Sequence, residues 1–438
     1  MLIISYYFPP AGGSSVQRVL KFVKYLPQFG WQPYVLTARE KDYPLKDNSL
    51  IQDIPKTLNI YRTPAPDLYQ LYERLGKKSA DSAVDISSLS IKEGAEKNLL
   101  KRVALFIRAA FFIPDARVGW LPFALIKGLQ IIHKEKVQFI FVSAPPFTTT
   151  LIGGLLSKLS GLPWVSDYRD PWTQAYFYFT RPIFSARLES FLEKKLLHHA
   201  NQFVAINQPL LELVSQKYDD NLQKKSIIIS NGFDPEDFEG IKPVKNSQFT
   251  VTYTGTINTK MEPTTFLKAV HMLAKENRDF SRQIQIQLIG RVGDDIKKQI
   301  LSLGLNQQIH FIDHLPHDEC LAYTLGADIL LLLIPDDETS PLMMTGKLFE
   351  YLKSGNPILC LSEDSMAAKI IQDTQTGWTV SPKNTEQIQA ILKDTFAKWQ
   401  KGKNLLKKSV RQNLIDQFDR KMGAKKLADV FHAVLKSD

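Results

Sequence analysis

The stretch between residues 329 and 361 constrains the fold more than any other part of the sequence, because it has the pattern of a strand, a helix and a second strand. Residues 329–334 form an uninterrupted apolar run, which is typical of a strand buried on both faces of a parallel sheet. Gly346 lies where a helix should begin, and Gly355 should end that helix before a second apolar run, Ile358–Leu361. The pattern predicts an open parallel sheet, which binds ligands where strands end and the following helices begin.

The predicted helix carries two charged side chains near that ligand-binding edge, Lys347 and Glu350. The backbone N–H groups and the dipole at a helix N-terminus favour phosphate, and a nearby lysine can neutralise a diphosphate. A glutamate one turn further along can accept hydrogen bonds from both hydroxyls of a ribose. A surface helix with an ordinary charged face has the same composition, so the residues alone leave both interpretations open.

The letters TGKLFEYLKSGNPIL, which begin at Thr345, resemble the donor-binding segment of the GT-B glycosyltransferases, specifically the retaining enzymes of glycosyltransferase family four. The resemblance implies that Glu350 holds the donor ribose. It also implies donor contacts from Thr345, Gly346, Lys347 and Leu348.

The second half of the chain departs from the family pattern at two positions. Leu342 stands where the family has an earlier glutamate, seven residues before the ribose-binding one. Thr256, after Gly255, stands where many relatives have a diphosphate-binding arginine, and Lys260 corresponds to a lysine of theirs. Lys347 is therefore expected to carry more of the phosphate contact. The predicted donor-binding residues outside the helix are Gly255, Thr256, Lys260 and Arg291 in this half.

A glycine pair, Gly12 and Gly13, follows the first predicted strand of the chain. Glycines at this place let the backbone approach a ligand closely, although their spacing is not that of a dinucleotide fingerprint. A double glycine after a strand is also a common turn. The letters YYFPPAGGSSVQR resemble the opening of the family, which implies that this loop lies over the donor phosphates and near the acceptor.

Three charged residues, Asp167, Arg169 and Asp170, lie at the end of another short predicted strand. Charged residues at the carboxyl end of a strand are expected to point into the ligand crevice. An internal salt bridge between Arg169 and one of the two aspartates is an equally good interpretation. The surrounding letters, SAPPFTTTLIGGLLSKLSGLPWVSDYRDPW, resemble the N-domain signature of a bacterial branch of the family, which implies that all three lie on the acceptor side.

Three histidines, His310, His314 and His317, lie within eight residues of one another, but no cysteine or carboxylate spacing completes a zinc site. We therefore expect no metal. The family resemblance likewise implies that neither a metal nor a cofactor is needed, because the nucleotide-diphosphate sugar is a substrate.

A chain of 438 residues is too long for one ordinary core and predicts two domains. We expect an α/β protein with the GT-B fold, in which two doubly wound Rossmann-like domains face each other across a cleft. The N-terminal, acceptor-side domain is predicted at residues 1–240, with a helix at 416–438 packing back on it. The C-terminal, nucleotide-sugar-binding domain is predicted at residues 241–415.

The formal net charge of +10 favours an anionic partner. Residues 99–113 combine basic with apolar and aromatic side chains. This pattern is typical of a helix in an anionic membrane interface, and equally of a helix packed on a core. The basic segment 187–199 supports the membrane interpretation. Nucleic acid is not expected, because the charge is dispersed and no binding motif accompanies it. Two cysteines and the lack of an apolar leader predict a cytoplasmic protein, soluble or peripheral on the inner face of the cytoplasmic membrane.

The combined prediction is a hexosyltransferase that moves a sugar from a nucleotide-diphosphate sugar to an acceptor, with retention of configuration and without metal. Its candidate catalytic residues are Asp170, Lys347 and Glu350, and the expected acceptor is a cell-envelope glycan or glycolipid. Two alternatives remain open. One is a non-catalytic sugar-nucleotide-binding partner protein, and the other is a GT-B sugar-nucleotide epimerase, which would convert the donor without an acceptor.

Overall fold

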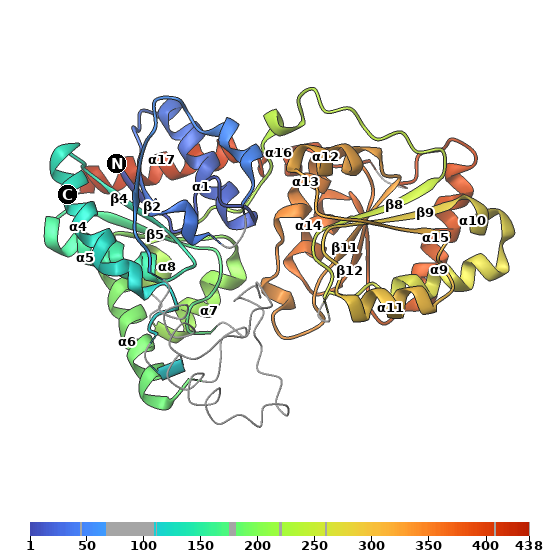
Figure 1. Cartoon of the computed structure of the whole chain (residues 1–438), viewed down its shortest axis with the longest axis horizontal. Helices are drawn as coiled ribbons and strands as arrows, with labels where there is room; N and C mark the ends of the chain where they lie inside the picture. The colour runs from blue at the N-terminus through green and yellow to red at the C-terminus, as the bar shows by residue number, and fades with distance from the viewer. Residues whose placement is uncertain are drawn as a thin grey trace. The chain divides into compact units, whose positions relative to one another are not determined.

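The computed structural model describes residues 1–43, 46–66, 109–110, 112–174, 181–218, 221–258, 261–406 and 409–437 (Figure 1). These residues form two compact units. The first unit contains Met1–Ser230 together with Lys421–Asp438, and the second contains Asn231–Arg420. Lys260 and most of the basic segment 99–113 lie outside the described residues.

The sequence placed the division between domains at residue 240, whereas the second unit begins at Asn231. The reason is a pairing close to the boundary. Phe233 N–H donates to Phe418 O at 3.1 Å, and Arg420 N–H donates to Phe233 O at 2.9 Å. The chain after Ser230 is thereby tied to the second unit, and Val244 N–H continues this attachment by donating to Ala322 O.

The first unit is built on a seven-stranded sheet in which every pairing is parallel. Its strand order is β3-β2-β1-β4-β5-β6-β7, so the direction of winding reverses between β1 and β4. The strands are β1 (Leu2–Ile4), β2 (Tyr34–Ala38), β3 (Asn59–Thr63), β4 (Ile140–Ala144), β5 (Trp164–Tyr168), β6 (Gln202–Ala205) and β7 (Ser226–Ile228).

Helices cover this sheet and include one that comes from the C-terminal end of the chain. The described helices are α1 (Ser14–Tyr25), α4 (Leu121–Lys134), α5 (Thr148–Ser160), α6 (Ile183–His199), α7 (Gln208–Tyr218), α8 (Asn221–Lys224) and α17 (Arg420–Ser437). The ring of Phe431 in α17 lies 5.2 Å from that of Trp31 and 4.7 Å from that of Phe139. Helix α17 therefore packs into the core of the first unit, where Figure 1 draws it in red.

The second unit repeats the same plan with a six-stranded parallel sheet of order β10-β9-β8-β11-β12-β13. Here the winding reverses between β8 and β11. The strands are β8 (Phe249–Thr254), β9 (Ile284–Ile289), β10 (Ile309–Ile312), β11 (Ile329–Leu333), β12 (Ile358–Leu361) and β13 (Gly377–Val380). The helices are α9 (Thr264–Glu276), α10 (Arg278–Gln283), α11 (Asp294–Ser302), α12 (His317–Gly326), α13 (Gly346–Ser354), α14 (Met366–Thr374), α15 (Thr385–Trp399) and α16 (Gln412–Asp416).

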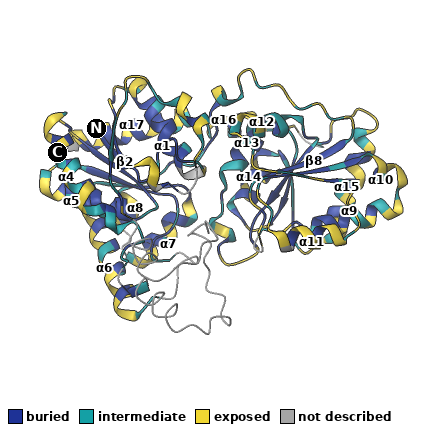
Figure 2. Ribbon diagram, in the orientation of Figure 1, coloured by how far each residue is buried: buried dark blue, intermediate teal, exposed yellow. Residues whose placement is uncertain are grey.

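The predicted strand–helix–strand unit is β11, α13 and β12. All residues of both strands are buried, and Gly355 ends the helix at a φ of 78° with its N–H donating to Leu352 O. Figure 2 shows the central strands of both sheets mostly in dark blue, while the edge strands β3, β7 and β13 are mostly of intermediate exposure. The prediction of an α/β protein with two doubly wound units is therefore confirmed. None of the described helices is long and apolar enough to cross a membrane.

Candidate functional site

The point where the second sheet reverses its winding brings Gly255 and Lys347 together. Gly255 follows the end of β8 at a φ of 131°, in the region that favours glycine. A Cβ atom on Gly255 would lie 2.3 Å from Lys347 Nζ, so any side chain here would displace this lysine from its place. Tyr351 fixes the helix at this end of the sheet, because its hydroxyl accepts a hydrogen bond from Thr254 N–H at 3.0 Å.

Lys347 is a half-buried cation that interacts with an aromatic ring. Its Nζ donates to the Tyr253 hydroxyl at 3.0 Å and lies 4.3 Å from the centre of the Tyr253 ring. Among the described residues no carboxylate lies within ion-pair distance of Nζ. Burial lowers the pKa of Lys347 to about 8, and the nearby Glu350 raises it in part. The charge is thus held without a full counter-charge, which is the condition expected of a site for an anion.

Glu350 lies one turn further along α13 and is paired with a histidine that the sequence analysis did not assign to the site. His317 Nε2 lies 2.9 Å from Glu350 Oε1, and since a carboxylate only accepts, Nε2 carries the proton. Burial raises the pKa of Glu350, but His317, Arg420 and Lys347 lower it by more. Glu350 is therefore an ionised carboxylate. His317 begins α12, 33 residues earlier in the chain, and no local signal links the two positions.

The N-terminus of α13 has polar groups that can still form hydrogen bonds with a ligand. Thr345 is its N-cap, but the side chain makes no capping bond, and Oγ1 is buried without a hydrogen-bond partner among the described residues. Gly346 follows with no side chain to cover the first backbone N–H groups. Leu348 is fully buried, so only its backbone can contribute to the predicted donor site.

Other predicted donor-binding residues lie at the same end of the second sheet. Thr256 is exposed, and its carbonyl accepts from the Tyr253 hydroxyl at 3.0 Å. Arg291 is exposed in the turn after β9, where its carbonyl accepts from Ile257 N–H at 2.8 Å. The two turns touch, because a Cβ on Gly290 would lie 2.5 Å from Gly255 O.

In the first unit, Gly12 and Gly13 also follow a strand at the reversal of winding. Gly13 precedes α1 at a φ of 99° and a Cβ there would meet nothing within 4 Å, so backbone conformation rather than crowding favours glycine. The pair lies between the carboxyl end of β1 and a helix N-terminus, where a parallel sheet binds ligands.

Asp167 has a structural role instead of the predicted acceptor contact. Its carboxylate is completely buried and pairs with Arg18, whose Nε and Nη2 lie 2.9 and 2.7 Å from the two oxygens. Ser143 Oγ donates to the same carboxylate at 2.8 Å. Asp167 thus faces the core between β5 and α1, which corrects its assignment to the acceptor side.

Arg169 and Asp170 lie beyond that buried pair. Arg169 is 9% exposed, and its guanidinium donates to the carbonyls of Ala144 and Pro145, so it holds the turn after β4. Asp170 is half-buried, and no described residue donates a hydrogen bond to it. Burial raises the pKa of Asp170, and Arg169 lowers it in part. Of the three, Asp170 has the carboxylate that a ligand could still use.

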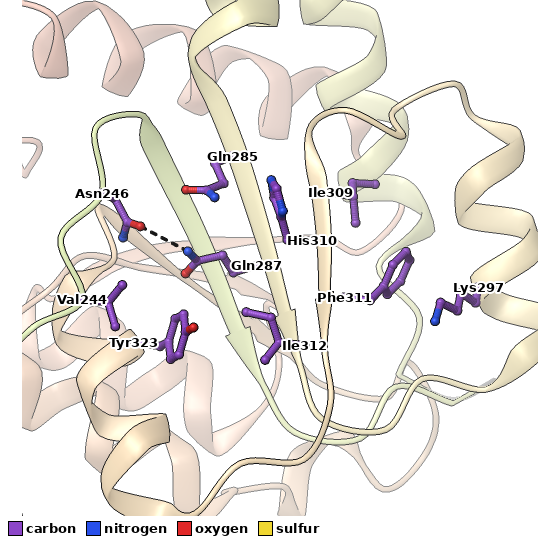
Figure 3. A pocket seen from close by; sticks show the side chains of 10 residues that line it. All are labelled: Val244, Asn246, Gln285, Gln287, Lys297, Ile309, His310, Phe311, Ile312 and Tyr323. Carbon is purple, nitrogen blue, oxygen red and sulfur yellow. Dashed lines mark hydrogen bonds between the residues drawn. The ribbon is translucent and has the colours of Figure 1, made fainter.

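A pocket of about 650 Å³ lies elsewhere in the second unit, against strands β9 and β10 (Figure 3). Within it Gln287 Nε2 donates to Asn246 Oδ1 at 3.2 Å. The lining contains none of the predicted donor-binding residues. It consists of Val244, Asn246, Gln285, Gln287, Lys297, Ile309, His310, Phe311, Ile312 and Tyr323. The described part of the chain contains no group of three or more histidine, cysteine, aspartate or glutamate side chains that could hold a metal ion.

Residues 235–412 match the model of the family described as glycosyl transferases group 1. This part of the chain is therefore similar to the group 1 glycosyltransferases. It contains every predicted donor-binding residue of the second unit. No curated protein matches the sequence.

Solved structures resemble the whole chain. The sucrose-phosphate synthase from Thermosynechococcus elongatus has a TM-score of 0.64 at 14% identity, covering 100% of this chain and 99% of its own. An E. coli structure described as trehalose-6-phosphate bound with UDP-2-fluoro glucose has a TM-score of 0.61 at 11% identity, with 98% of each chain covered. WaaG, a glycosyltransferase involved in lipopolysaccharide biosynthesis, has a TM-score of 0.56 at 14% identity, again with 98% of each covered. These similarities show the GT-B fold.

Proposed function

We propose that the protein transfers a hexose from a nucleotide-diphosphate sugar to an acceptor, with retention of configuration and without a metal ion. The observation that carries the proposal is the pairing of Lys347 with Gly255 at the reversal of winding, one turn from the ionised Glu350. The group 1 glycosyltransferase match over residues 235–412 supports it.

The two charged side chains of α13 have separate roles in the proposal. Lys347 and the first backbone N–H groups of α13 bind the diphosphate. The diphosphate supplies the negative counter-charge that Lys347 does not have when the site is empty. Glu350 accepts hydrogen bonds from the two ribose hydroxyls, with His317 holding its carboxylate in place. Both contacts come from one helix, so their separation is fixed by the helix itself.

The reaction forms a bond between the acceptor hydroxyl oxygen and the anomeric carbon of the sugar. The bond from that carbon to the phosphate oxygen breaks, and its electron pair leaves with the nucleoside diphosphate. The hydroxyl proton passes to the leaving phosphate. Lys347 and the N-terminus of α13 stabilise the negative charge that grows on the diphosphate. We assign no nucleophile to the protein.

The proposed acceptor is a cell-envelope glycan or glycolipid, and the proposed location is the cytoplasm or the inner face of the cytoplasmic membrane. The net charge of +10 supports an anionic surface or substrate. WaaG, one of the similar structures, is described as acting in lipopolysaccharide biosynthesis. On the acceptor side, Asp170 is the proposed contact for a hydroxyl, because no described residue donates to its half-buried carboxylate.

Thermal unfolding with UDP, GDP, ADP, TDP and CMP tests the donor site in the wild type, in Lys347→Ala and in Glu350→Ala. A ligand at 100 times its Kd adds about 2.7 kcal/mol to the free energy of unfolding. We expect one diphosphate to stabilise the wild type and neither variant. The exposed residues Lys393 and Glu276 provide matched controls, Lys393→Ala and Glu276→Ala, which should respond as the wild type does. No response to any nucleotide would refute the proposed site.

Leu342 and Thr256 favour a second candidate, a protein that binds nucleotide sugars without transferring them, because each replaces a family residue that the reaction uses. Incubation of the chain with the radiolabelled donor and a lipid extract separates the possibilities. Labelled product with retained configuration supports the transferase, conversion of the donor without acceptor supports an epimerase, and binding without turnover supports the non-catalytic protein.

A further inference from the structure

Over residues 183–193, helix α6 (Ile183–His199) has its apolar and polar sides reversed relative to an ordinary surface helix, whereas Leu196 and Leu197 near its end are buried. Four large apolar side chains are exposed along it: Ile183 by 73%, Phe184 by 56%, Leu188 by 46% and Phe191 by 56%. The opposite side buries polar residues at four-residue intervals, Ser185, Glu189 and Glu193, each at most 5% exposed. A soluble helix normally buries the first set and exposes the second.

The buried polar residues fix the rotation of the helix. Arg181 Nε lies 2.8 Å from Glu189 Oε2, and Trp172 Nε1 donates to the other oxygen at 3.4 Å. Glu193 Oε2 accepts from Thr173 Oγ1 at 2.5 Å and from the Tyr218 hydroxyl at 2.6 Å. Rolling α6 to bury its phenylalanines would break these contacts and leave carboxylates without partners, so the apolar residues stay outside.

The exposed side of α6 carries positive charge and no acid. Arg187, Lys194 and Lys195 are exposed, while both glutamates of the helix are among the buried residues. Helical spacing places the cations on the same side as Phe184, Leu188 and Phe191. Lys195 Nζ lies 5.8 Å from the centre of the Phe191 ring. The outer side of α6 is yellow in Figure 2 along much of its length.

This combination selects one kind of partner. A large exposed apolar patch marks an interaction surface. Two copies of α6 meeting across a twofold axis would bring like charges together, which disfavours a second copy of the chain. A helix with aromatic and aliphatic residues among cations, and with no exposed acid, matches the surface of a bilayer that contains anionic lipid.

We propose that α6 docks the first unit on an anionic membrane surface, lying in the plane of the interface with its four exposed apolar side chains among the lipids. Arg187, Lys194 and Lys195 contact the headgroups. The proposal goes beyond sugar transfer and stands without it, because it depends only on α6 and its supports.

Cosedimentation of the full chain with vesicles tests the docking. Vesicles of phosphatidylcholine containing about one-third phosphatidylglycerol should retain the wild type at low salt, and vesicles of phosphatidylcholine alone should not. Lys194→Glu with Lys195→Glu should weaken binding at least 25-fold, because each positive charge near an anionic surface contributes about fivefold to the affinity and two are removed. Phe184→Ser with Phe191→Ser should reduce binding at least tenfold even at low salt, because the apolar contact is lost.

Helix α11 supplies matched controls, because it exposes Lys297, Lys298 and Leu301 without an apolar stripe. Lys297→Glu with Lys298→Glu, and Leu301→Ser, should bind vesicles as the wild type does. All the substituted side chains are exposed, so melting temperatures should stay close to that of the wild type.

Three results would overturn the proposal. In the first, the wild type does not bind anionic vesicles. In the second, the control variants lose as much binding as the α6 variants. In the third, the wild type is a dimer, and Phe184→Ser with Phe191→Ser converts it to a monomer. Nucleotide stabilisation of the second unit is measured separately. A failure of docking therefore differs from a failure of the proposed donor site.

Discussion

Replacing Lys347 by methionine should stabilise the empty protein and abolish its stabilisation by nucleoside diphosphates. Burial lowers the pKa of this lysine from 10.5 to about 8, which means that the folded protein holds the charge at a cost. Methionine has a similar length and no charge, so it removes that cost. The same substitution removes the cation that the proposed donor site needs.

The magnitude follows from the pKa. A fall from 10.5 to about 8 corresponds, at 1.36 kcal/mol per unit, to a penalty of about 3 kcal/mol at pH 7. Methionine also loses the hydrogen bond to the Tyr253 hydroxyl and the contact with its ring, which together are worth about 1–2 kcal/mol. The net gain is therefore about 1–2 kcal/mol, which raises the melting temperature of a unit of this size by about 2–8 °C.

The pH dependence has a definite sign. Between pH 8 and 10.5 the unfolded chain keeps the Lys347 proton that the folded chain has lost, so the wild type gains stability as the pH rises through this window. Lys347→Met lacks the titrating group, and its advantage over the wild type should shrink from pH 8 to pH 10.5. Other titrating groups are common to both proteins and cancel in the difference.

Urea unfolding at pH 7 and pH 10, with and without the diphosphate that stabilises the wild type, measures all of these quantities. Lys393→Met, at an exposed position of α15, is the control and should change stability by less than about 0.5 kcal/mol. A Lys347→Met protein that is less stable than the wild type at pH 7, or an advantage that does not shrink above pH 8, would refute the reasoning.

Three further substitutions test other parts of the site. Gly255→Ala places a methyl group 2.3 Å from Lys347 Nζ and should abolish nucleotide stabilisation in the thermal assay, whereas Gly304→Ala, with open space around it, should retain it despite a strain of about 1–2 kcal/mol. His317→Leu removes the partner that lowers the pKa of Glu350, so a pH titration of nucleotide binding should show loss at a higher pH on acidification than in the wild type. Asp167→Asn should cost about 3–5 kcal/mol in urea unfolding of the first unit without affecting nucleotide stabilisation by the second; a stable variant that has lost only sugar transfer would contradict the structural role.

The central strand–helix–strand unit could be predicted because its signals are local. An apolar run of strand length, a glycine at the helix start and Gly355 at its end all act within a few residues. The C-terminal helix α17 could also be predicted from local signals. Its predicted start at residue 416 differs from the observed start at Arg420, because a separate short helix, α16, ends at Asp416. Boundaries of this kind depend on single turns, which the apolar periodicity does not resolve.

The partners of charged residues could not be predicted, because they come from distant parts of the chain. Asp167 has the sequence context of a crevice residue, but Arg18 lies 149 positions away and reaches it across the fold. The spacing of the three histidines predicts no metal site, and the contact of His317 with Glu350 depends on how α12 and α13 pack. Arg187 was recognised as part of a basic segment, but the burial of Glu189 and Glu193, which turns the apolar residues outward, is a tertiary effect.

The state of α13 argues for an anionic ligand more strongly than its sequence does. A helix selected only for stability would place an uncharged residue at 347, pair Glu350 with a lysine and satisfy Thr345 Oγ1. Here the lysine is half-buried with a lowered pKa, the glutamate is held by His317, and the threonine hydroxyl has no partner among the described residues. The buried lysine charge and the threonine hydroxyl without a partner cost stability in the empty protein, and both are relieved by a group that brings negative charge and hydrogen-bond acceptors to the helix N-terminus. A diphosphate supplies both, and the adjoining ribose brings two hydroxyls to Glu350, so one ligand accounts for all three observations.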